Sequence, residues 1–185
     1  MRELLCIRGA PGVGKSTAAR LLVRRTGGSL LEVDQLRSMF VAVDWVSQRE
    51  HLRALAVAAD LAASLLRQRF GPVLVVDTFS RGKLRTFLDG LAAAGVPGEA
   101  IGHVSLWASP AELSRRVDAR PADHFRDVAV CLALNEASSR PEADGEKVLD
   151  TTGLTPADVA SMIMAHFRPP PDTTTGGSPP PGSAG

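Results

Sequence analysis

Short runs of apolar residues alternate along the chain with longer segments in which apolar positions recur every three or four residues. Five of the runs are apolar at nearly every position, which is typical of strands buried on both faces. They span residues 3–8, 29–33, 72–77, 102–107 and 146–150. Because helical patterns separate them, the alternation predicts a parallel sheet with helices on both sides, in an α/β protein.

The segments between these runs carry residues that typically begin and end helices. Ser47, Ser109 and Thr155 are each followed three residues later by an acidic residue, a pattern that satisfies free N–H groups at a helix start. Gly27 and Gly95 follow the ends of two other helical patterns. These signals predict helices over residues 15–25, 47–69, 82–94, from 109 onward, and from 155 to about 167.

Composition limits the number of domains. The chain has 185 residues, of which 44% are hydrophobic and 22% charged, and its net charge is +1. This suits one compact domain, which we expect over residues 1–168. Residues 169–185 contain only Pro, Gly, Ser, Thr, Ala and one Asp, a composition that predicts a disordered tail.

Location and partners can be inferred from the same data. No run approaches the roughly 18 apolar residues of a membrane span, and the first apolar run is too short for a secretory signal. We therefore expect a cytoplasmic protein that does not associate with membranes. The near-neutral charge offers no broad electrostatic surface for nucleic acid, although basic residues can still cluster locally. Neither Cys6 and Cys131 nor His51 and His103 match a metal-ligand spacing.

A glycine-rich motif directly follows the first apolar run. It fits the pattern G-x-x-x-x-G-K-[S/T] without departure, and between a strand and a helix this pattern predicts a phosphate-binding loop, or P-loop. Glycines let backbone N–H groups curl around phosphate oxygens, Lys15 bridges the β- and γ-phosphates, and Ser16 offers its hydroxyl to Mg²⁺. We therefore expect ATP and Mg²⁺ as cofactors. The nucleotide-binding candidates are Gly9, Ala10, Pro11, Gly12, Val13, Gly14, Lys15, Ser16 and Thr17.

A carboxylate and an arginine follow the second apolar run. Residues 30–34 predict a strand that ends at Asp34, and Arg37 lies on the same face if a helical turn starts there. In a parallel sheet, this strand end lies at the same edge as the P-loop. Asp34 can there accept a proton from an acceptor hydroxyl, while Arg37 holds the acceptor or the migrating phosphoryl group. The alternative is that Asp34 only caps a helix and Arg37 is a solvated charge. Glu32 is expected to point elsewhere.

The P-loop followed by strand-Asp34-x-x-Arg37 resembles the small P-loop kinases: polynucleotide 5′-kinases, zeta-toxin-like kinases, chloramphenicol phosphotransferase and adenylylsulfate kinase. The resemblance covers residues 1–168. It implies a P-loop NTPase fold, a three-layer α/β/α sandwich whose five-stranded parallel sheet has the order 2-3-1-4-5, with a helical lid. It also implies that Asp34 is the acceptor-side base and that Arg37 binds substrate or phosphate.

The third apolar run ends in Asp77, which is the form of a Walker B strand. Such an aspartate can hold Mg²⁺ through a water molecule. Aspartate at a strand end is also common without a metal, but the P-loop upstream favours the metal interpretation. Arg81 and Arg85 follow in a stretch that resembles the kinase group, where an arginine often faces the acceptor; a solvated helix surface explains them equally well.

Two arginines precede Pro121 after the fourth run. Arg116 and Arg120 are four residues apart and can share a helix face. The segment resembles the lid of small P-loop kinases, expected here over residues 116–128, in which arginines close over ATP and stabilise charge on the transferred group. An arginine-rich exposed helix is the alternative.

The last apolar run ends in a turn that leads into the final helix. In the resembling kinases this turn lies beside the adenine ring. By that resemblance, the candidates for the base pocket are Thr151, Thr152 and Leu154.

These observations favour a kinase that transfers the γ-phosphoryl group of Mg-ATP to a hydroxyl. The acceptor can be a small metabolite, an antibiotic or nucleoside, or adenylylsulfate. A polynucleotide 5′ end is less favoured because the chain is nearly neutral and lacks the companion domains of some polynucleotide kinases. The alternative from another class is an ATPase or nucleotide-dependent switch without an acceptor, although five strands leave little room for the additional elements of motor ATPases.

Overall fold

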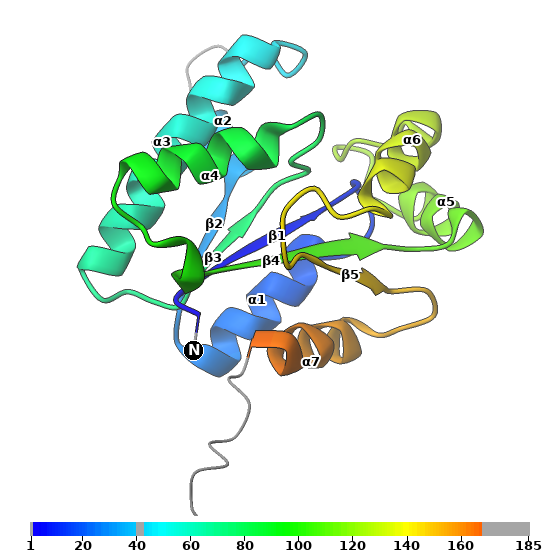
Figure 1. The fold of residues 1–185 in the computed structure, drawn as a ribbon. Helices are drawn as coiled ribbons and strands as arrows, with labels where there is room; N and C mark the ends of the chain where they lie inside the picture. The colour runs from blue at the N-terminus through cyan, green and yellow to red at the C-terminus, as the bar shows by residue number, and fades with distance from the viewer. Residues whose placement is uncertain (1, 40–42, 168–185) are drawn as a thin grey trace, which may run out of the picture.

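The computed structural model describes residues 2–39 and 43–167, so the expected tail lies outside the described residues. Five strands form one parallel sheet in the order β2-β3-β1-β4-β5 (Figure 1). This confirms the predicted sheet and its strand order. The strands are β1 (Leu4–Gly9), β2 (Ser29–Glu32), β3 (Val73–Val76), β4 (Ile101–Trp107) and β5 (Lys147–Asp150).

Helices cover both faces of this sheet. Figure 1 shows α1 beside α7 on one face and α3 beside α4 on the other, which confirms the three layers. The helices are α1 (Lys15–Thr26), α2 (Val33–Ser38), α3 (Gln48–Arg67), α4 (Lys83–Ala93), α5 (Pro110–Asp118), α6 (Val128–Ser138) and α7 (Pro156–Phe167), with a 3₁₀ turn, η1 (Gly98–Ala100).

The two layers of the core are separated by the alternation of side chains along each strand. In β1, Leu4 and Cys6 pack with β3, α3 and α4, whereas Leu5 and Ile7 pack with α1, β4 and α7. Every residue of β1 is buried. The continuous hydrophobic run seen in the sequence therefore reflects a strand covered on both faces.

The structure differs from the sequence expectation at two places, the end of the second strand and helix α6. The expected second strand ends two residues early, at Glu32, and Asp34 lies in the first turn of α2. Helix α6 was not predicted. Its buried face carries Cys131, Asn135 and Ser138, so polar side chains occupy positions where an apolar stripe would have marked a helix.

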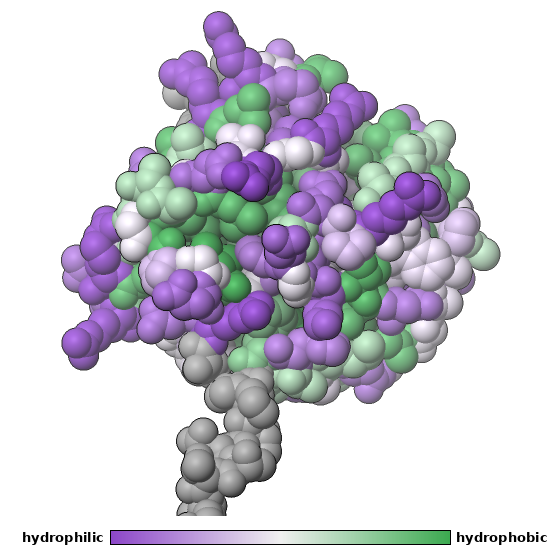
Figure 2. All heavy atoms as spheres, viewed as in Figure 1, coloured by the Kyte–Doolittle hydropathy of each residue, from purple (hydrophilic) through white to green (hydrophobic). Residues whose placement is uncertain are grey.

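The face of the molecule drawn in Figure 2 is largely hydrophilic, with apolar side chains gathered in a hollow between α4 and η1. A cavity of about 230 Å³ lies there, lined in part by Leu88, Val96 and Ile101. None of the helices in the described part of the chain combines the length and the hydropathy that a membrane crossing requires.

Candidate functional site

The P-loop joins β1 to α1 and packs closely on β4 and α5. Gly9 has a φ of 144°, and a Cβ atom there would lie 2.5 Å from the carbonyl oxygen of Leu106. Gly12 has a φ of 88°, and its Cβ would lie 2.8 Å from Cγ2 of Val117. Gly14, with a φ of 104°, is the N-cap of α1. Glycine is thus needed for backbone conformation at all three positions, and for space at Gly9 and Gly12. The loop has the strand–loop–helix context that the motif predicts.

Lys15 extends back along the P-loop. Its Nζ donates hydrogen bonds to the carbonyl oxygens of Gly9 (2.8 Å) and Ala10 (2.9 Å). Burial lowers the pKa of Lys15 to about 8, and the negative charges of Asp77 and Asp34 limit the decrease. An anion bound in the loop would raise this pKa, because it would stabilise the charged ammonium.

A cavity of about 530 Å³ opens at the carboxyl edge of the sheet, in front of the P-loop. It brings together candidates from four separate segments of the chain, because the carboxyl ends of parallel strands meet at one edge. The expected site residues that line it are Pro11, Gly12, Gly14, Lys15, Ser16, Thr17, Asp34, Asp77, Arg116 and Arg120. Those that do not line it are Gly9, Ala10, Val13, Arg37, Thr151, Thr152 and Leu154.

Asp34 faces this cavity from the first turn of α2. Burial and the neighbouring charge of Asp77 raise its pKa, while Lys15, His51 and Arg37 act in the opposite direction. The carboxyl group is therefore more basic than an ordinary aspartate, which suits a group that accepts a proton.

Arg37 is buried and does not line the cavity. Its Nη2 donates to the carbonyl oxygen of Asp44 (3.0 Å), and its guanidinium lies 4.7 Å from the centre of the Trp45 ring. Glu50 is 3.9 Å away. Arg37 thus holds the segment before α3, and its charge also acts on Asp34. A contact between Arg37 and an acceptor stays a prediction.

Glu32 lies next to the P-loop, so the expectation that it points elsewhere was wrong. Its Oε2 accepts a hydrogen bond from the Ser16 hydroxyl (2.9 Å), and its Oε1 forms an ion pair with Arg20 (2.8 Å). The strand ends at Glu32 rather than at Asp34, and Glu32 lines the cavity.

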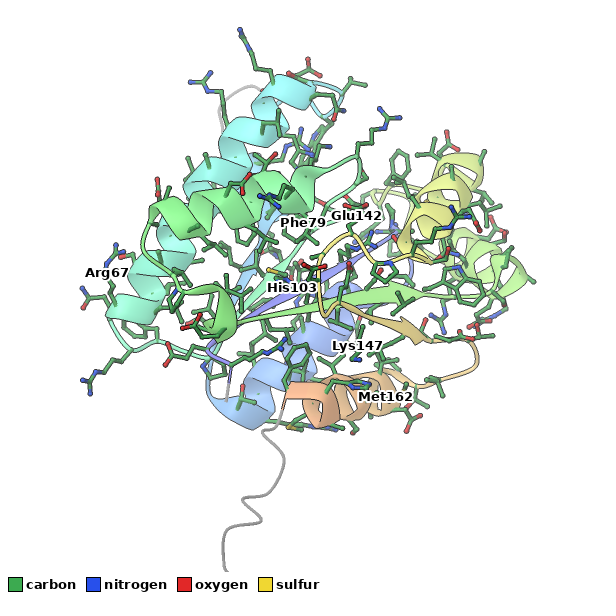
Figure 3. All side chains as sticks on the ribbon, in the orientation of Figure 1. Arg67, Phe79, His103, Glu142, Lys147 and Met162 are labelled. Carbon is green, nitrogen blue, oxygen red and sulfur yellow. The ribbon has the colours of Figure 1, made fainter. Side chains whose placement is uncertain are left out.

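Asp77 lies just after β3 and is almost entirely buried. Its Oδ2 accepts hydrogen bonds from the backbone N–H of Phe79 (2.9 Å) and from Nε2 of His51 (3.0 Å). Burial alone would raise the pKa of Asp77, but these two hydrogen bonds and the charges of His51 and Lys15 lower it below its ordinary value. Figure 3 shows Phe79 beneath the end of α4, where its ring contacts Phe87 at 5.3 Å between centroids.

The residues present fit a magnesium ion that is bound mainly by phosphate and water. Asp77 Oδ1 is buried and has no hydrogen-bond partner among the described residues, so a carboxylate oxygen remains free on a side chain that lines the cavity. The Ser16 hydroxyl lines the same cavity. Within residues 2–39 and 43–167, no three His, Cys, Asp or Glu side chains are grouped so that they could hold a metal alone.

Arg116 connects two parts of the site, the P-loop and the turn after β5. Its guanidinium donates to the carbonyl oxygens of Val13 (3.3 Å) and Thr151 (2.7 Å) and to Thr151 Oγ1 (3.1 Å). Its Nε pairs with Glu112 at 2.7 Å. Arg116 is therefore held in place on the cavity wall between the P-loop and the turn after β5.

Arg120 lies in the segment between α5 and α6, which is where the lid was expected. Its Nη1 donates to the carbonyl oxygen of Phe125 (2.8 Å), within the same segment. Residues 119–127 form no α-helix, so only the flanking ends of the expected lid, at α5 and α6, are helical. Pro121 and His124 from this segment also line the cavity.

The turn after β5 contributes to the site indirectly. Thr151 is buried and its hydroxyl donates to the carbonyl oxygen of Trp107 (2.9 Å). The hydroxyl of Thr152 accepts from the backbone N–H of Ser109 (2.8 Å), and Leu154 packs against the core. These side chains fix the turn on β4 and α5, while Arg116 links it to the cavity.

Sequence reasoning missed Glu32 and His51. A signal for His51 does exist, because it begins the buried stripe that continues in α3 with Ala54, Leu55 and Ala58. A histidine in such a stripe needs a polar partner inside the protein. The sequence could not show that the partner is Asp77, which lies 26 positions later.

Comparison with known proteins relates this site to a family. A family model described as an AAA domain matches residues 4–142. A search of curated proteins gave no match.

Several solved structures share the fold over most of their length. A sugar kinase from Janibacter sp. HTCC2649 has a TM-score of 0.68 and 16% identity, covering 89% of this chain and 94% of that one. The APS kinase CysC of Mycobacterium tuberculosis, solved with AMPPNP and APS, has a TM-score of 0.68 and 19% identity, with 89% and 96% covered. A gluconokinase from Sinorhizobium meliloti 1021 has a TM-score of 0.66 and 19% identity, with 89% and 91% covered. The chain therefore has the fold of small P-loop kinases and belongs to the AAA domain family.

Proposed function

We propose that this protein is a kinase that transfers the γ-phosphoryl group of ATP to a hydroxyl of a small-molecule acceptor. The observation that carries the proposal is that the P-loop and a separate carboxylate with a raised pKa, Asp34, line one cavity. A nucleotide switch needs the first feature but not the second. The kinases of the same fold support this proposal, because those reported above include a sugar kinase, a gluconokinase and an APS kinase.

On the donor side, the P-loop would bind the triphosphate. Its backbone N–H groups and the N-terminus of α1 supply partial positive charge, and Lys15 adds a full charge. Lys15 would exchange its two carbonyl partners in the loop for phosphate oxygens. Arg120 would add positive charge from the lid, which we place at residues 116–128 of a domain spanning residues 1–168.

On the acceptor side, Asp34 would take the proton of the acceptor hydroxyl. The hydroxyl oxygen then forms a bond to the γ-phosphorus, the bond from that phosphorus to the β–γ bridging oxygen breaks, and ADP leaves with the bonding electrons. The raised pKa of Asp34 makes it a stronger base than a solvated aspartate.

Ser16 and Asp77 would hold the magnesium ion, Asp77 through a water molecule. The ion, when bound, supplies positive charge that neutralises the phosphates. The turn containing Thr151, Thr152 and Leu154 is proposed to flank the base, with Arg116 connecting that turn to the cavity.

The test is to supply ATP and Mg²⁺ with a panel of hydroxyl compounds and to follow ADP formation and new phosphate esters by ³¹P NMR. We expect acceptor-dependent turnover. Lys15→Ala should abolish turnover and weaken nucleotide binding, since it removes charge from the phosphate site. Asp34→Asn should leave ATP affinity unchanged and reduce transfer by about 10²–10⁴-fold, the usual contribution of a general base.

Two results would refute the proposal. Full-rate ATP hydrolysis without any acceptor would favour an ATPase. A loss of ATP affinity in Asp34→Asn as large as in Lys15→Ala, with transfer otherwise intact, would exclude Asp34 as the base.

A further inference from the structure

The hydrogen bond between His51 and Asp77 links two distant elements beside the P-loop. His51 lies in the first turn of α3 and is 6% exposed, while Asp77 follows β3 and is 3% exposed. Their side chains meet at 3.0 Å, from Nε2 to Oδ2. A buried polar contact of this kind is retained only if its geometry compensates for lost hydration.

The direction of this hydrogen bond follows from the chemistry of the partners. An ionised carboxylate can only accept, so Nε2 of His51 must carry the proton and donate it. The Phe79 N–H donates to the same oxygen at 2.9 Å. The His51 ring and the Phe79 N–H therefore both donate to Oδ2 of Asp77. Oδ1 is left without a partner among the described residues.

Both donors are themselves held in place. Phe79 has a φ of 47°, a conformation that costs energy for a non-glycine residue and is maintained here by a fully buried ring. The turn that carries His51 begins at Ser47, whose side chain accepts a hydrogen bond from the N–H of Glu50 at 3.2 Å. The Asp77 carboxylate is thus fixed by two rigid supports, and it cannot rotate without breaking both bonds.

We propose that His51 is a positioning residue, which holds the Asp77 carboxylate so that Oδ1 keeps no protein partner and can serve the divalent cation that accompanies the nucleotide. His51 touches neither nucleotide nor acceptor in this arrangement and acts only through Asp77. The proposal rests on the proposed function only in requiring that a nucleotide binds with a divalent cation, and no acceptor is needed.

Three variants separate this role from simple packing. His51→Leu fills similar space without a donor. His51→Gln carries an amide nitrogen at the same number of bonds from Cβ as Nε2, so it can restore the hydrogen bond. His51→Asn is equally polar but one bond shorter, and its amide cannot reach. Comparison of the Gln and Asn variants remains informative if the Leu variant does not fold.

The experiment measures AMPPNP affinity of the full chain with Mn²⁺ and with EDTA, together with Mn²⁺ binding by electron paramagnetic resonance. His51→Leu and His51→Asn should weaken Mn²⁺ binding in the nucleotide complex by about 10–100-fold, the range observed when the group that orients a metal ligand is removed. Their affinity for AMPPNP in EDTA should remain that of the unmodified chain. His51→Gln should stay within about threefold, because the donor is restored.

His103→Leu serves as the matched control, since His103 is also a nearly buried histidine but lies in β4 and does not line the cavity. It should alter neither measurement. In Asp77→Asn, the additional change His51→Leu should have no further effect on Mn²⁺ binding, since the two residues act as one unit.

The proposal is overturned if His51→Leu and His51→Asn lose as much AMPPNP affinity in EDTA as with Mn²⁺, or if Mn²⁺ binding is unchanged in both. Additive effects of His51→Leu and Asp77→Asn would also overturn it. Normal Mn²⁺–AMPPNP binding without any phosphoryl transfer would instead refute the proposed kinase function, and the variants would still decide the role of His51.

Discussion

Arg116 and Arg115 offer a controlled test of how the site is held together. The two residues are neighbours on α5 and share one partner, because both form ion pairs with Glu112, at 2.7 and 2.8 Å. Only Arg116 also reaches the P-loop and the turn after β5, through Val13 and Thr151. Arg116→Ala should therefore destabilise the protein, whereas Arg115→Ala should not.

The magnitude follows from the contacts of the Arg116 guanidinium outside its own helix. It forms a short bond to the Thr151 carbonyl oxygen (2.7 Å), a normal one to Thr151 Oγ1 (3.1 Å) and a long one to Val13 (3.3 Å). Its side chain is 18% exposed, so part of this energy is screened by water. With about 1 kcal/mol for each of the two better bonds, we expect a loss of about 2 kcal/mol. For a chain of this size that lowers Tm by about 4–8 °C.

The assay is urea and thermal unfolding of both variants, followed by AMPPNP binding. Arg115 is 69% exposed, so Arg115→Ala should leave Tm and affinity unchanged. Arg116→Ala should also weaken AMPPNP binding, because the P-loop and the turn after β5 lose their shared contact. Equal shifts of Tm in the two variants would refute the argument, since they would trace the stabilisation to the Glu112 pair alone.

Two further predictions concern the acceptor-side base and the support of α6. Since burial and Asp77 raise the pKa of Asp34 above its ordinary value of 3.8, transfer should fall with acidification at a higher pH than for a solvated aspartate; kcat/KM measured against pH should show this limb, and its persistence in Asp34→Asn would contradict the assignment. Asn135→Leu should cost about 2–4 kcal/mol in urea unfolding, because the Asn135 amide both donates to the carbonyl oxygen of Ala108 and accepts from its N–H at a buried position. Ser139→Ala, at the half-buried C-cap of the same helix, should cost far less. Equal losses would show that the amide contributes nothing specific.

The fold followed from the sequence because its signals are local and agree with one another. Continuous apolar runs, helix-capping residues and the P-loop each depend on neighbouring residues, and they predicted all five strands. Helix α6 escaped because Asn135 and Ser138 lie on its buried face. Such polar residues are tolerated there only because carbonyl and N–H groups from elsewhere pair with them, and that pairing has no local pattern.

The sequence predicted some parts of the site and not others, because contacts between distant residues have no local pattern. The P-loop, Asp34 and Asp77 were expected near one another, because parallel strands deliver their carboxyl ends to one edge, and all three line one cavity. Arg37 was expected to face an acceptor, and its tertiary contacts with Asp44 and Trp45 had no signal in the sequence. A long flexible side chain can reach in several directions, and only the packed neighbours select among them.

The sequence by itself therefore determined the layers of the protein, the position of the P-loop and the edge at which its chemistry would lie. These depend on hydrophobic periodicity and on glycine conformation, which are properties of short segments. Only the tertiary structure decided that Glu32 meets Ser16, that Arg116 connects the P-loop to the turn at Thr151, and that His51 donates to Asp77. Each of these contacts joins residues far apart in the chain, so its existence depends on how the elements pack and not on the residues that surround either partner in sequence.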